Sequence, residues 1–272
     1  MVKVILSLTL ALSIAAGSAC QGNKTELSNK QANTTPANTA ATAASSAGEQ
    51  KVTINSPDGL RLVGTLYAAD KPNSSALLLL HQWQSDRHSY DDFAKQMQRK
   101  GFAVLSIDGR GFGESTRAAD GMNVPPDRTD TAVKAMLGDV GVAFDFLLTQ
   151  KNVDPARVAI VGASYGSSLA LIYAADNPKV KAVVLLSPGL NYFGNMQTEP
   201  AIKKYGDRPL LLVAANDDTE SADSVNKLKT AGANAKYEAK IYDKGGHGTG
   251  LLTAGVGLEG QLAEFLIKTL AK

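Results

Sequence analysis

The stretch that most constrains the fold of this chain is residues 158–175, where a strand pattern changes to a helix pattern across a short turn. Val158–Val161 is apolar and β-branched, which predicts a buried strand. Ser167–Ala175 has apolar residues at helical spacing, which predicts a helix packed on a sheet. Between them, Gly162-Ala163-Ser164-Tyr165-Gly166 has glycines on both sides of Ser164, as a tight turn requires. A strand–turn–helix unit is therefore predicted, with a serine at its tip.

This G-x-S-x-G turn also has a chemical interpretation. A strained strand-to-helix turn lifts the serine hydroxyl above the sheet and points the next backbone N–H at the same space, beside the positive end of the helix. Ser164 is then a candidate nucleophile, and the N–H of Tyr165 is a candidate oxyanion donor. The alternative is an ordinary tight turn in which Ser164 caps the helix.

Strand and helix patterns alternate along the chain from Lys51 onward. Strands are predicted at Lys51–Asn55, Leu60–Tyr67, Ala76–Leu80, Ala103–Ile107, Val158–Val161, Lys181–Leu186, Leu210–Ala214 and Lys236–Tyr242. Helices are predicted at Phe93–Lys100, Leu137–Gln150, Ser167–Ala175, Ser221–Ala231 and Leu258–Leu270. The first two strands read as an antiparallel hairpin. The alternation predicts an α/β fold, a doubly wound, mostly parallel sheet of about eight strands with helices on both faces. Its ligand site belongs at the carboxyl ends of the central strands.

Composition narrows the classes of partner. The 272 residues are 44% hydrophobic and 20% charged, enough for one full domain. A formal net charge of +2 implies no strong attraction to nucleic acid or anionic lipid. The single cysteine excludes an intrachain disulfide. Metal-ligand spacing, a phosphate-loop lysine and a dinucleotide fingerprint are missing from the sequence, so we expect no metal and no cofactor.

The first twenty residues have the pattern of an export signal. Lys3 precedes an apolar run, and Gly17-Ser18-Ala19 is a small-residue cleavage site, so residues 1–19 are predicted to be a signal peptide. Cys20 follows at once and resembles the acylated cysteine of bacterial lipoproteins, although Gly17 stands where that family usually has a leucine-like residue. We expect an exported protein anchored to a membrane only through Cys20. The alternative is ordinary cleavage after Ala19, which releases a soluble protein.

The segment from residue 20 to residue 50 is rich in Ala, Thr, Asn and Ser and has no apolar periodicity. Such a segment cannot bury enough apolar surface to fold, so it is predicted to be a flexible tether. The alternative is a leader without an anchor. The folded domain is then residues 51–272.

Polar residues follow several of the predicted strands. His81-Gln82-Trp83 comes after Ala76–Leu80, Asp217 after Leu210–Ala214, and His247 between glycines after Lys236–Tyr242. Together with Ser164 these give the chain order Ser, Asp, His. From Lys51 onward the chain resembles the α/β-hydrolase superfamily, in particular its serine esterases and dienelactone hydrolases.

The resemblance implies roles for these residues. His247 would be the base that activates Ser164, and Asp217 the carboxylate that orients His247. Asp218 is the competitor; Ala214, three residues before Asp217, favours the first aspartate. The alternative is that both are solvated loop acids.

The resemblance extends to two loops. His81 matches the first, structural residue of the family's H-G-x oxyanion segment, in which Trp83 would supply the second N–H donor; Gln82 replaces the family's glycine. Asp108–Ser115 matches a D-x-R-G-x-G-x-S segment, and we expect Asp108 and Arg110 to hold this loop as scaffold. His88 is expected to have no role.

These features predict a serine hydrolase that cleaves a small-molecule ester through an acyl-enzyme. A peptidase or thioesterase on the same residues, or a non-catalytic lipoprotein that binds ligands, are the alternatives. Residues 187–208 and 115–134 are too short for a cap domain and have no lid helix. We therefore expect a shallow site walled by Trp83, Tyr192 and Phe193, with a preference for short acyl chains.

Overall fold

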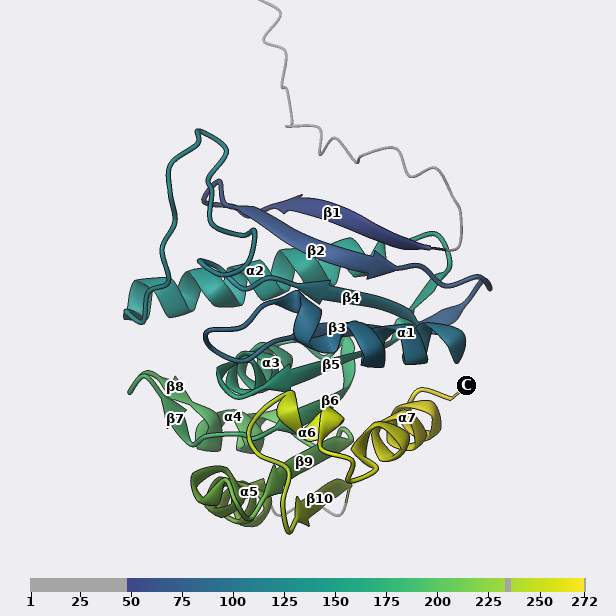
Figure 1. Cartoon of the computed structure of the whole chain (residues 1–272), viewed down its shortest axis with the longest axis vertical. Helices are drawn as coiled ribbons and strands as arrows, with labels where there is room; N and C mark the ends of the chain where they lie inside the picture. Colours follow the sequence, from purple (N-terminus) through teal and green to yellow (C-terminus); the bar gives the residue numbers. More distant parts are fainter. Residues whose placement is uncertain (1–47, 233–235, 272) are drawn as a thin grey trace, which may run out of the picture. The chain divides into compact units, whose positions relative to one another are not determined.

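The computed structural model describes residues 48–232 and 236–271, which belong to one compact unit (Figure 1). The predicted signal peptide, Cys20 and nearly all of the predicted tether lie outside the described residues. The strands are β1 Glu49–Asn55, β2 Arg61–Tyr67, β3 Ser74–Leu80, β4 Ala103–Ile107, β5 Val153–Ala163, β6 Val180–Leu186, β7 Asn191–Tyr192, β8 Met196–Gln197, β9 Leu210–Ala215 and β10 Tyr237–Tyr242. The helices are the 3-10 helix η1 Arg87–Tyr90 and the α-helices α1 Asp91–Arg99, α2 Asp130–Leu148, α3 Tyr165–Asp176, α4 Thr198–Tyr205, α5 Thr219–Gly232, α6 Gly250–Thr253 and α7 Leu258–Thr269.

The main sheet has eight strands in the order β1-β2-β4-β3-β5-β6-β9-β10. Only β2 runs against its neighbours, since it pairs antiparallel with both β1 and β4. The remaining neighbours are parallel. The predicted fold class, a mostly parallel sheet of about eight strands, is confirmed.

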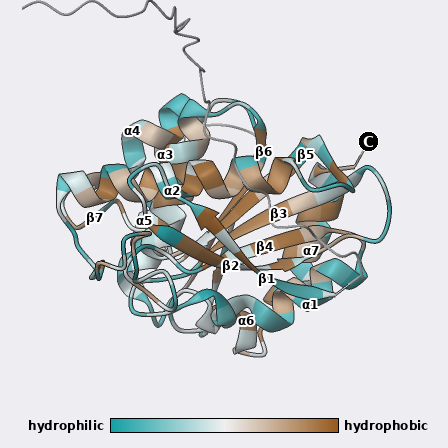
Figure 2. Cartoon of the chain, turned by 90° about the horizontal axis from the view of Figure 1, so that it is seen from above, coloured by the Kyte–Doolittle hydropathy of each residue, from teal (hydrophilic) through white to brown (hydrophobic). Residues whose placement is uncertain are grey.

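Helices cover both faces of this sheet and divide its core in two (Figure 2). Leu78 and Leu80 of β3 belong to the cluster formed with α2, α3, α4 and α5, whereas Leu77 and Leu79 belong to the cluster formed with α1, α6 and α7. Every residue of β3 is buried, because side chains alternate between two covered faces. This explains why the central strands are continuous apolar runs.

The structure differs from the predicted elements at a few ends. Helix α2 begins at Asp130 instead of Leu137, and the Thr129 hydroxyl caps it by accepting the N–H of Ala132 at 3.2 Å. The two-residue strands β7 and β8 form a hairpin that was not predicted. Within the described residues, no helix is long and apolar enough to cross a membrane.

The parallel strands all point their carboxyl ends to one edge of the sheet, here called the carboxyl edge. The strands β3, β5, β6, β9 and β10 end there at Leu80, Ala163, Leu186, Ala215 and Tyr242. The loops and turns that follow these five strands contain the side chains of the candidate site, except that of Arg128, which lies in the loop before α2. The opposite edge is here called the amino edge.

Candidate active site

The turn between β5 and α3 holds Ser164 in a strained conformation. Its backbone has φ 53° and ψ −124°, a region that residues with a side chain rarely occupy. The Ser164 N–H donates to the carbonyl of Leu186 at 2.8 Å, which fixes the turn against β6. The Ser164 side chain makes no capping hydrogen bond to α3. The capping alternative therefore has no support, and the hydroxyl is left available for chemistry.

Two glycines permit this turn because other backbone approaches them closely. A Cβ on Gly162 would lie 2.2 Å from the carbonyl oxygen of Gly166. A Cβ on Gly166 would lie 2.6 Å from the carbonyl oxygens of Leu80 and His81. Neither contact can be relieved by moving a flexible side chain, so any larger residue would displace the turn.

The carboxylate that contacts His247 is Asp218, and the prediction that Asp217 does so is wrong. His247 Nδ1 lies 2.7 Å from Asp218 Oδ2. Asp217 turns to the backbone of the histidine loop, and accepts the N–H of Gly245 at 3.1 Å and that of Gly246 at 3.0 Å. The physical reason is the loop path after β9, which presents neighbouring side chains to different partners. Asp217 shapes the loop, and Asp218 holds the imidazole.

The surroundings of Asp218 favour its ionised form. Partial burial raises the pKa of its carboxyl group, but hydrogen bonds from Ser221, His247 and Ser187 outweigh this effect and leave the pKa below its ordinary value. An ionised carboxylate can only accept, so Nδ1–H of His247 donates to Asp218, and Nε2 is left free to act as a base.

Ser187, which sequence reasoning missed, connects these loops. It follows β6 directly, is fully buried and has a positive φ of 49°. Its hydroxyl accepts the N–H of Gly248 at 2.9 Å and interacts with Asp218. Its position at the end of a central strand was the signal that could have found it, because the other site residues share that position.

Gln82 has a structural purpose in place of the expected glycine. Its side-chain oxygen accepts the N–H of Thr249 at 3.2 Å and the Thr249 hydroxyl at 2.8 Å. The loop that contains Trp83 is thereby tied to the loop that contains His247.

The two candidate oxyanion donors have no hydrogen-bond acceptor within the described residues. Tyr165 is the first residue of α3, so its N–H has no intrahelical acceptor, and no acceptor contacts the N–H of Trp83.

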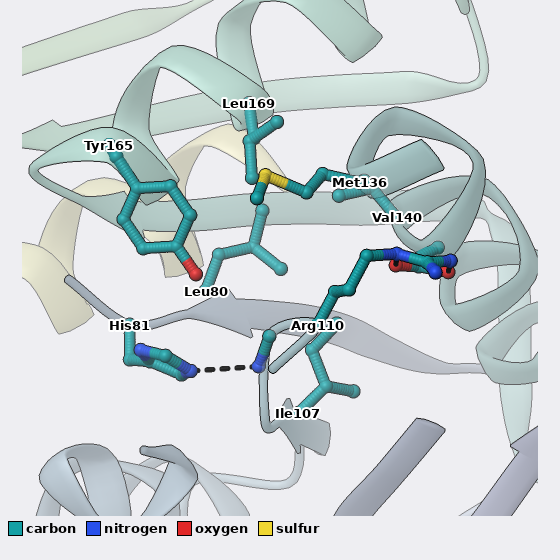
Figure 3. A pocket seen from close by; sticks show the side chains of 10 residues that line it. Leu80, His81, Ile107, Arg110, Met136, Val140, Tyr165 and Leu169 are labelled. Atoms are coloured by element: carbon teal, nitrogen blue, oxygen red, sulfur yellow. Dashed lines mark hydrogen bonds and ion pairs between the residues drawn. The ribbon is translucent and has the colours of Figure 1, made fainter. Parts of the chain in front are cut away.

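His81 is a buried neutral residue of the scaffold. Burial lowers the pKa of its imidazole. Nε2 accepts the N–H of Gly109 at 2.8 Å, and Nδ1 therefore has the proton and lies 2.7 Å from the carbonyl of Gln82 (Figure 3). His81 holds the loops after β3 and β4 together, as expected for a structural residue. His88 lies away from the site at the surface and pairs with Asp91.

Aromatic side chains gather beside Ser164. The Trp83 ring lies 5.4 Å from Tyr165 and 4.7 Å from Phe193, measured between ring centroids. Tyr192 donates its hydroxyl to the carbonyl of Ser187 at 3.0 Å. Burial raises the pKa of the Tyr192 phenol, and its interaction with the Ser164 hydroxyl opposes this shift. The three predicted wall residues, Trp83, Tyr192 and Phe193, are thus brought to one place.

Arg128 was also missed, and it covers this aromatic cluster. Its guanidinium carbon lies 4.8 Å from the ring centroid of Trp83 and 5.1 Å from that of Phe193. Asn195 of the β7–β8 hairpin donates to the carbonyl of Arg128 at 3.0 Å and to Asp130 at 2.9 Å. The loop before α2 and the hairpin are therefore fastened together above the site.

Asp108 and Arg110 both hold the loop after β4 as scaffold, as expected, and each does so through its own partners. Asp108 pairs with Arg87 and accepts the N–H of Glu114 at 2.7 Å. Arg110 pairs instead with Asp139 of α2 at 2.8 Å and with Asp58 at 2.7 Å. The loop is thus held by two separate ion-pair clusters, one around Asp108 and one around Arg110.

A small cavity of about 20 Å³ lies behind the nucleophile turn (Figure 3). It is lined by His81, Arg110, Tyr165 and apolar residues of α2 and α3, and neither Ser164 nor His247 borders it. This volume suffices for about one water molecule and not for an acyl group. Among the described residues, no cluster of three or more His, Cys, Asp or Glu side chains is arranged to hold a metal ion.

Comparison with known proteins points to one enzyme class. The family described as Serine aminopeptidase, S33 matches residues 71–206. A thiohydrolase of Arthrinium phaeospermum is 32% identical over 140 residues, covering 51% of this chain and 43% of its own length. An uncharacterized protein of Mycobacterium tuberculosis is 30% identical over 138 residues, covering 50% of this chain and 44% of its own. The chain thus spans less than half the length of these curated relatives.

Solved structures share the fold at low sequence identity. An esterase of Pyrococcus furiosus superposes with a TM-score of 0.66 at 16% identity, and the match covers 82% of this chain and 94% of the esterase. A dienelactone hydrolase of Anabaena variabilis superposes with a TM-score of 0.63 at 18% identity, covering 82% of this chain and 98% of the hydrolase. These likenesses show that the fold is that of the α/β-hydrolase superfamily.

Proposed function

Because this chain belongs to the Serine aminopeptidase, S33 family and is a serine hydrolase by that membership, we propose that it cleaves carboxylic esters with short acyl groups through a covalent intermediate on Ser164. The observation that carries the proposal is the strained Ser164 turn at the same sheet edge as the His247–Asp218 contact of 2.7 Å. A strained serine without a capping bond is of little structural use, whereas a nucleophile on a strand-to-helix turn requires this backbone conformation.

The proposed reaction begins when Ser164 Oγ attacks the ester carbonyl carbon and passes its proton to His247 Nε2. Asp218 stabilises the imidazolium that forms and keeps its orientation. The carbonyl oxygen becomes an oxyanion, for which the N–H groups of Trp83 and Tyr165 are the proposed donors. Collapse of this intermediate expels the alcohol, which takes the proton from His247, and leaves an acyl-Ser164 ester. Water then attacks by the same route and releases the carboxylic acid.

The walls of the site support a preference for short acyl chains. Trp83, Tyr192 and Phe193 lie beside the nucleophile, and the Arg128 guanidinium covers two of these rings. The segment between β6 and β9 forms only the β7–β8 hairpin and α4. Each further methylene gains about 0.8 kcal/mol only if it is buried. With the Arg128 guanidinium over two of its aromatic walls, the site offers long chains little additional apolar surface.

A series of p-nitrophenyl esters from acetate to palmitate tests this proposal, with the Ser164→Ala variant as control. We expect the largest kcat/KM below the octanoyl ester and a loss of about 10⁶ in kcat in the variant. A maximum at octanoyl or longer would contradict the short-chain preference.

Peptide and thioester hydrolysis are the alternatives on the same residues, because the family description names an aminopeptidase and a matched relative is named a thiohydrolase. Aminoacyl p-nitroanilides and acyl thioesters of matched chain length distinguish them. A kcat/KM for either that exceeds the ester value, corrected for uncatalysed reactivity, would replace the ester assignment. If neither esters, aminoacyl p-nitroanilides nor thioesters are hydrolysed, the alternative of a non-catalytic lipoprotein that binds ligands replaces the enzyme.

We also propose that the protein is exported and anchored through an acylated Cys20. The support is the sequence alone: an apolar run, the small residues Gly17-Ser18-Ala19, and the only cysteine of the chain directly after them. Under this proposal the folded domain is held at a membrane surface by its lipid anchor.

A further inference from the structure

Basic residues stand at the amino edge of the sheet, one shortly before each of its consecutive parallel strands. In the spatial order β4-β3-β5-β6-β9-β10, a cation stands one to three residues before the first residue of each strand, namely Lys100, Lys71, Lys151, Lys179, Arg208 and Lys236. Because parallel strands all start at the same edge, these cations, which are scattered in sequence, form a row along it.

Much of this positive charge is available to a partner. Lys71, Lys100, Lys151 and Lys179 are exposed and form no ion pair within the described part of the chain. Arg208 is held by backbone carbonyls, including those of Asn177 and Val180, so no carboxylate neutralises it there. A surface groove beside the row is lined by Arg157, Lys181, Asp207, Arg208 and Lys236.

Acidic residues on the same edge offset only part of the charge. Asp154 pairs with Arg157, Asp176 with Lys204, Glu238 with Lys268 and Glu49 with Lys95, and each of these cations stands outside the row. Asp70 and Asp207 also lie on this edge. The row therefore keeps an excess of positive charge.

The carboxyl edge has the opposite character. Exposed acids gather in its loops and in the first turns of its helices, namely Asp127, Asp130, Asp217, Glu220, Asp223 and Asp243. Helix dipoles account for part of this segregation, since helix amino ends favour acids and carboxyl ends favour bases. The amino edge is nevertheless the more basic and the carboxyl edge the more acidic, although the carboxyl edge also holds Arg117, Lys134 and Lys244, and a net charge of +2 conceals this difference.

Two observations favour a bilayer over other polyanions. Strand β1 begins at Glu49, which lies opposite Tyr67 of β2 in the sheet. Tyr67 in turn lies opposite Val104, near the start of β4. The chain therefore enters the domain at the amino edge. Ile267 lies in the last turn of α7 and is 45% exposed. The carbonyl of Leu270, just beyond it, accepts a hydrogen bond from the Ser75 hydroxyl at the start of β3, so this helix end lies at the amino edge. An exposed apolar side chain beside lysines is typical of surfaces that lie on lipid headgroups.

We propose that the amino edge docks on an anionic phospholipid bilayer. This inference rests on the proposed export and not on the proposed ester hydrolysis. Docking in this orientation directs the carboxyl edge, with Ser164 and His247, away from the membrane. The substrates then reach the site from the aqueous side.

The test measures co-sedimentation of the full-length chain with vesicles of phosphatidylcholine alone and of phosphatidylcholine mixed with phosphatidylglycerol. Cys20→Ser is present in every sample, so an acyl anchor cannot contribute. One variant has Lys71→Glu, Lys151→Glu and Lys179→Glu at the amino edge. The matched control has Arg117→Glu, Lys134→Glu and Lys244→Glu near the carboxyl edge, which changes the net charge equally. Thermal unfolding shows that each variant is folded.

We expect binding to increase with phosphatidylglycerol and to weaken with added salt. Each lysine near an anionic surface contributes about fivefold to the affinity, so the amino-edge variant should lose on the order of 100-fold, and the control much less. Equal binding to both kinds of vesicle, or equal loss in both variants, overturns the proposal. Tighter binding to duplex DNA at the same phosphate concentration would also overturn it and assign the row to nucleic acid.

Discussion

At the residue level, the chemistry depends on which of two adjacent aspartates serves His247. Asp218 lies 2.7 Å from the imidazole, while Asp217 binds the N–H groups of Gly245 and Gly246. We expect Asp218→Asn to lower kcat by about 10⁴, because an amide cannot stabilise the imidazolium and favours the wrong tautomer. Asp217→Asn keeps one acceptor for the loop and should cost far less. Steady-state kinetics of both variants checks this, and the reverse order would restore Asp217 as the acid.

Some residues of the candidate site could be predicted from the sequence and others could not. Ser164 and His247 stood out as candidates because the G-x-S-x-G turn and the glycine-flanked histidine are visible in the sequence. The choice of Asp217 over Asp218 was wrong, since the histidine contact depends on the course of a loop after β9 that no side-chain pattern records. Arg128 was missed for a similar reason: its stacking partners, Trp83 and Phe193, are distant in sequence.

At the level of elements, the β5–α3 turn depends on close backbone contact. A Cβ on Gly166 would meet the Leu80 and His81 carbonyls at 2.6 Å, whereas a Cβ on Gly138 in α2 would meet nothing within 4 Å. Gly166→Ala should therefore lower the free energy of unfolding by about 1–3 kcal/mol and reduce activity. Gly138→Ala should raise stability by about 0.5–1 kcal/mol through helix propensity.

Chemical denaturation of the two glycine variants measures this difference directly. Both changes add the same methyl group, so the comparison isolates the surroundings. A Gly166→Ala protein with wild-type stability and turnover would show that the turn is looser than these contacts imply.

The strand pattern was predicted well at this level because the buried strands are read directly from continuous apolar runs. The β7–β8 hairpin was not, because each strand has two residues, too few to show a period. The early start of α2 was missed although its first turns place Ala132, Val133 and Met136 in the core at helical spacing, after the Thr129 cap.

At the level of the whole molecule, the sheet separates a catalytic edge from a basic edge, and the proposed anchor precedes the domain at the basic one. We expect metabolic labelling with palmitate to mark the wild-type chain in a bacterial host and not the Cys20→Ser variant. When the same extracts are separated into membrane and soluble fractions, a larger share of the Cys20→Ser variant than of the wild type should be soluble, because it has no acyl anchor. Equal labelling of both, or of neither, would remove the anchor and leave a secreted soluble protein.

The most direct measurement of the central claim is peptide mapping after reaction with an active-site fluorophosphonate. The account predicts one adduct, on Ser164, that forms rapidly in the wild type and disappears in Ser164→Ala. It also predicts that the adduct forms slowly in His247→Ala, because the serine then has no base. An adduct on a different serine, or an unreactive wild-type protein that is correctly folded, would contradict Ser164 as the nucleophile.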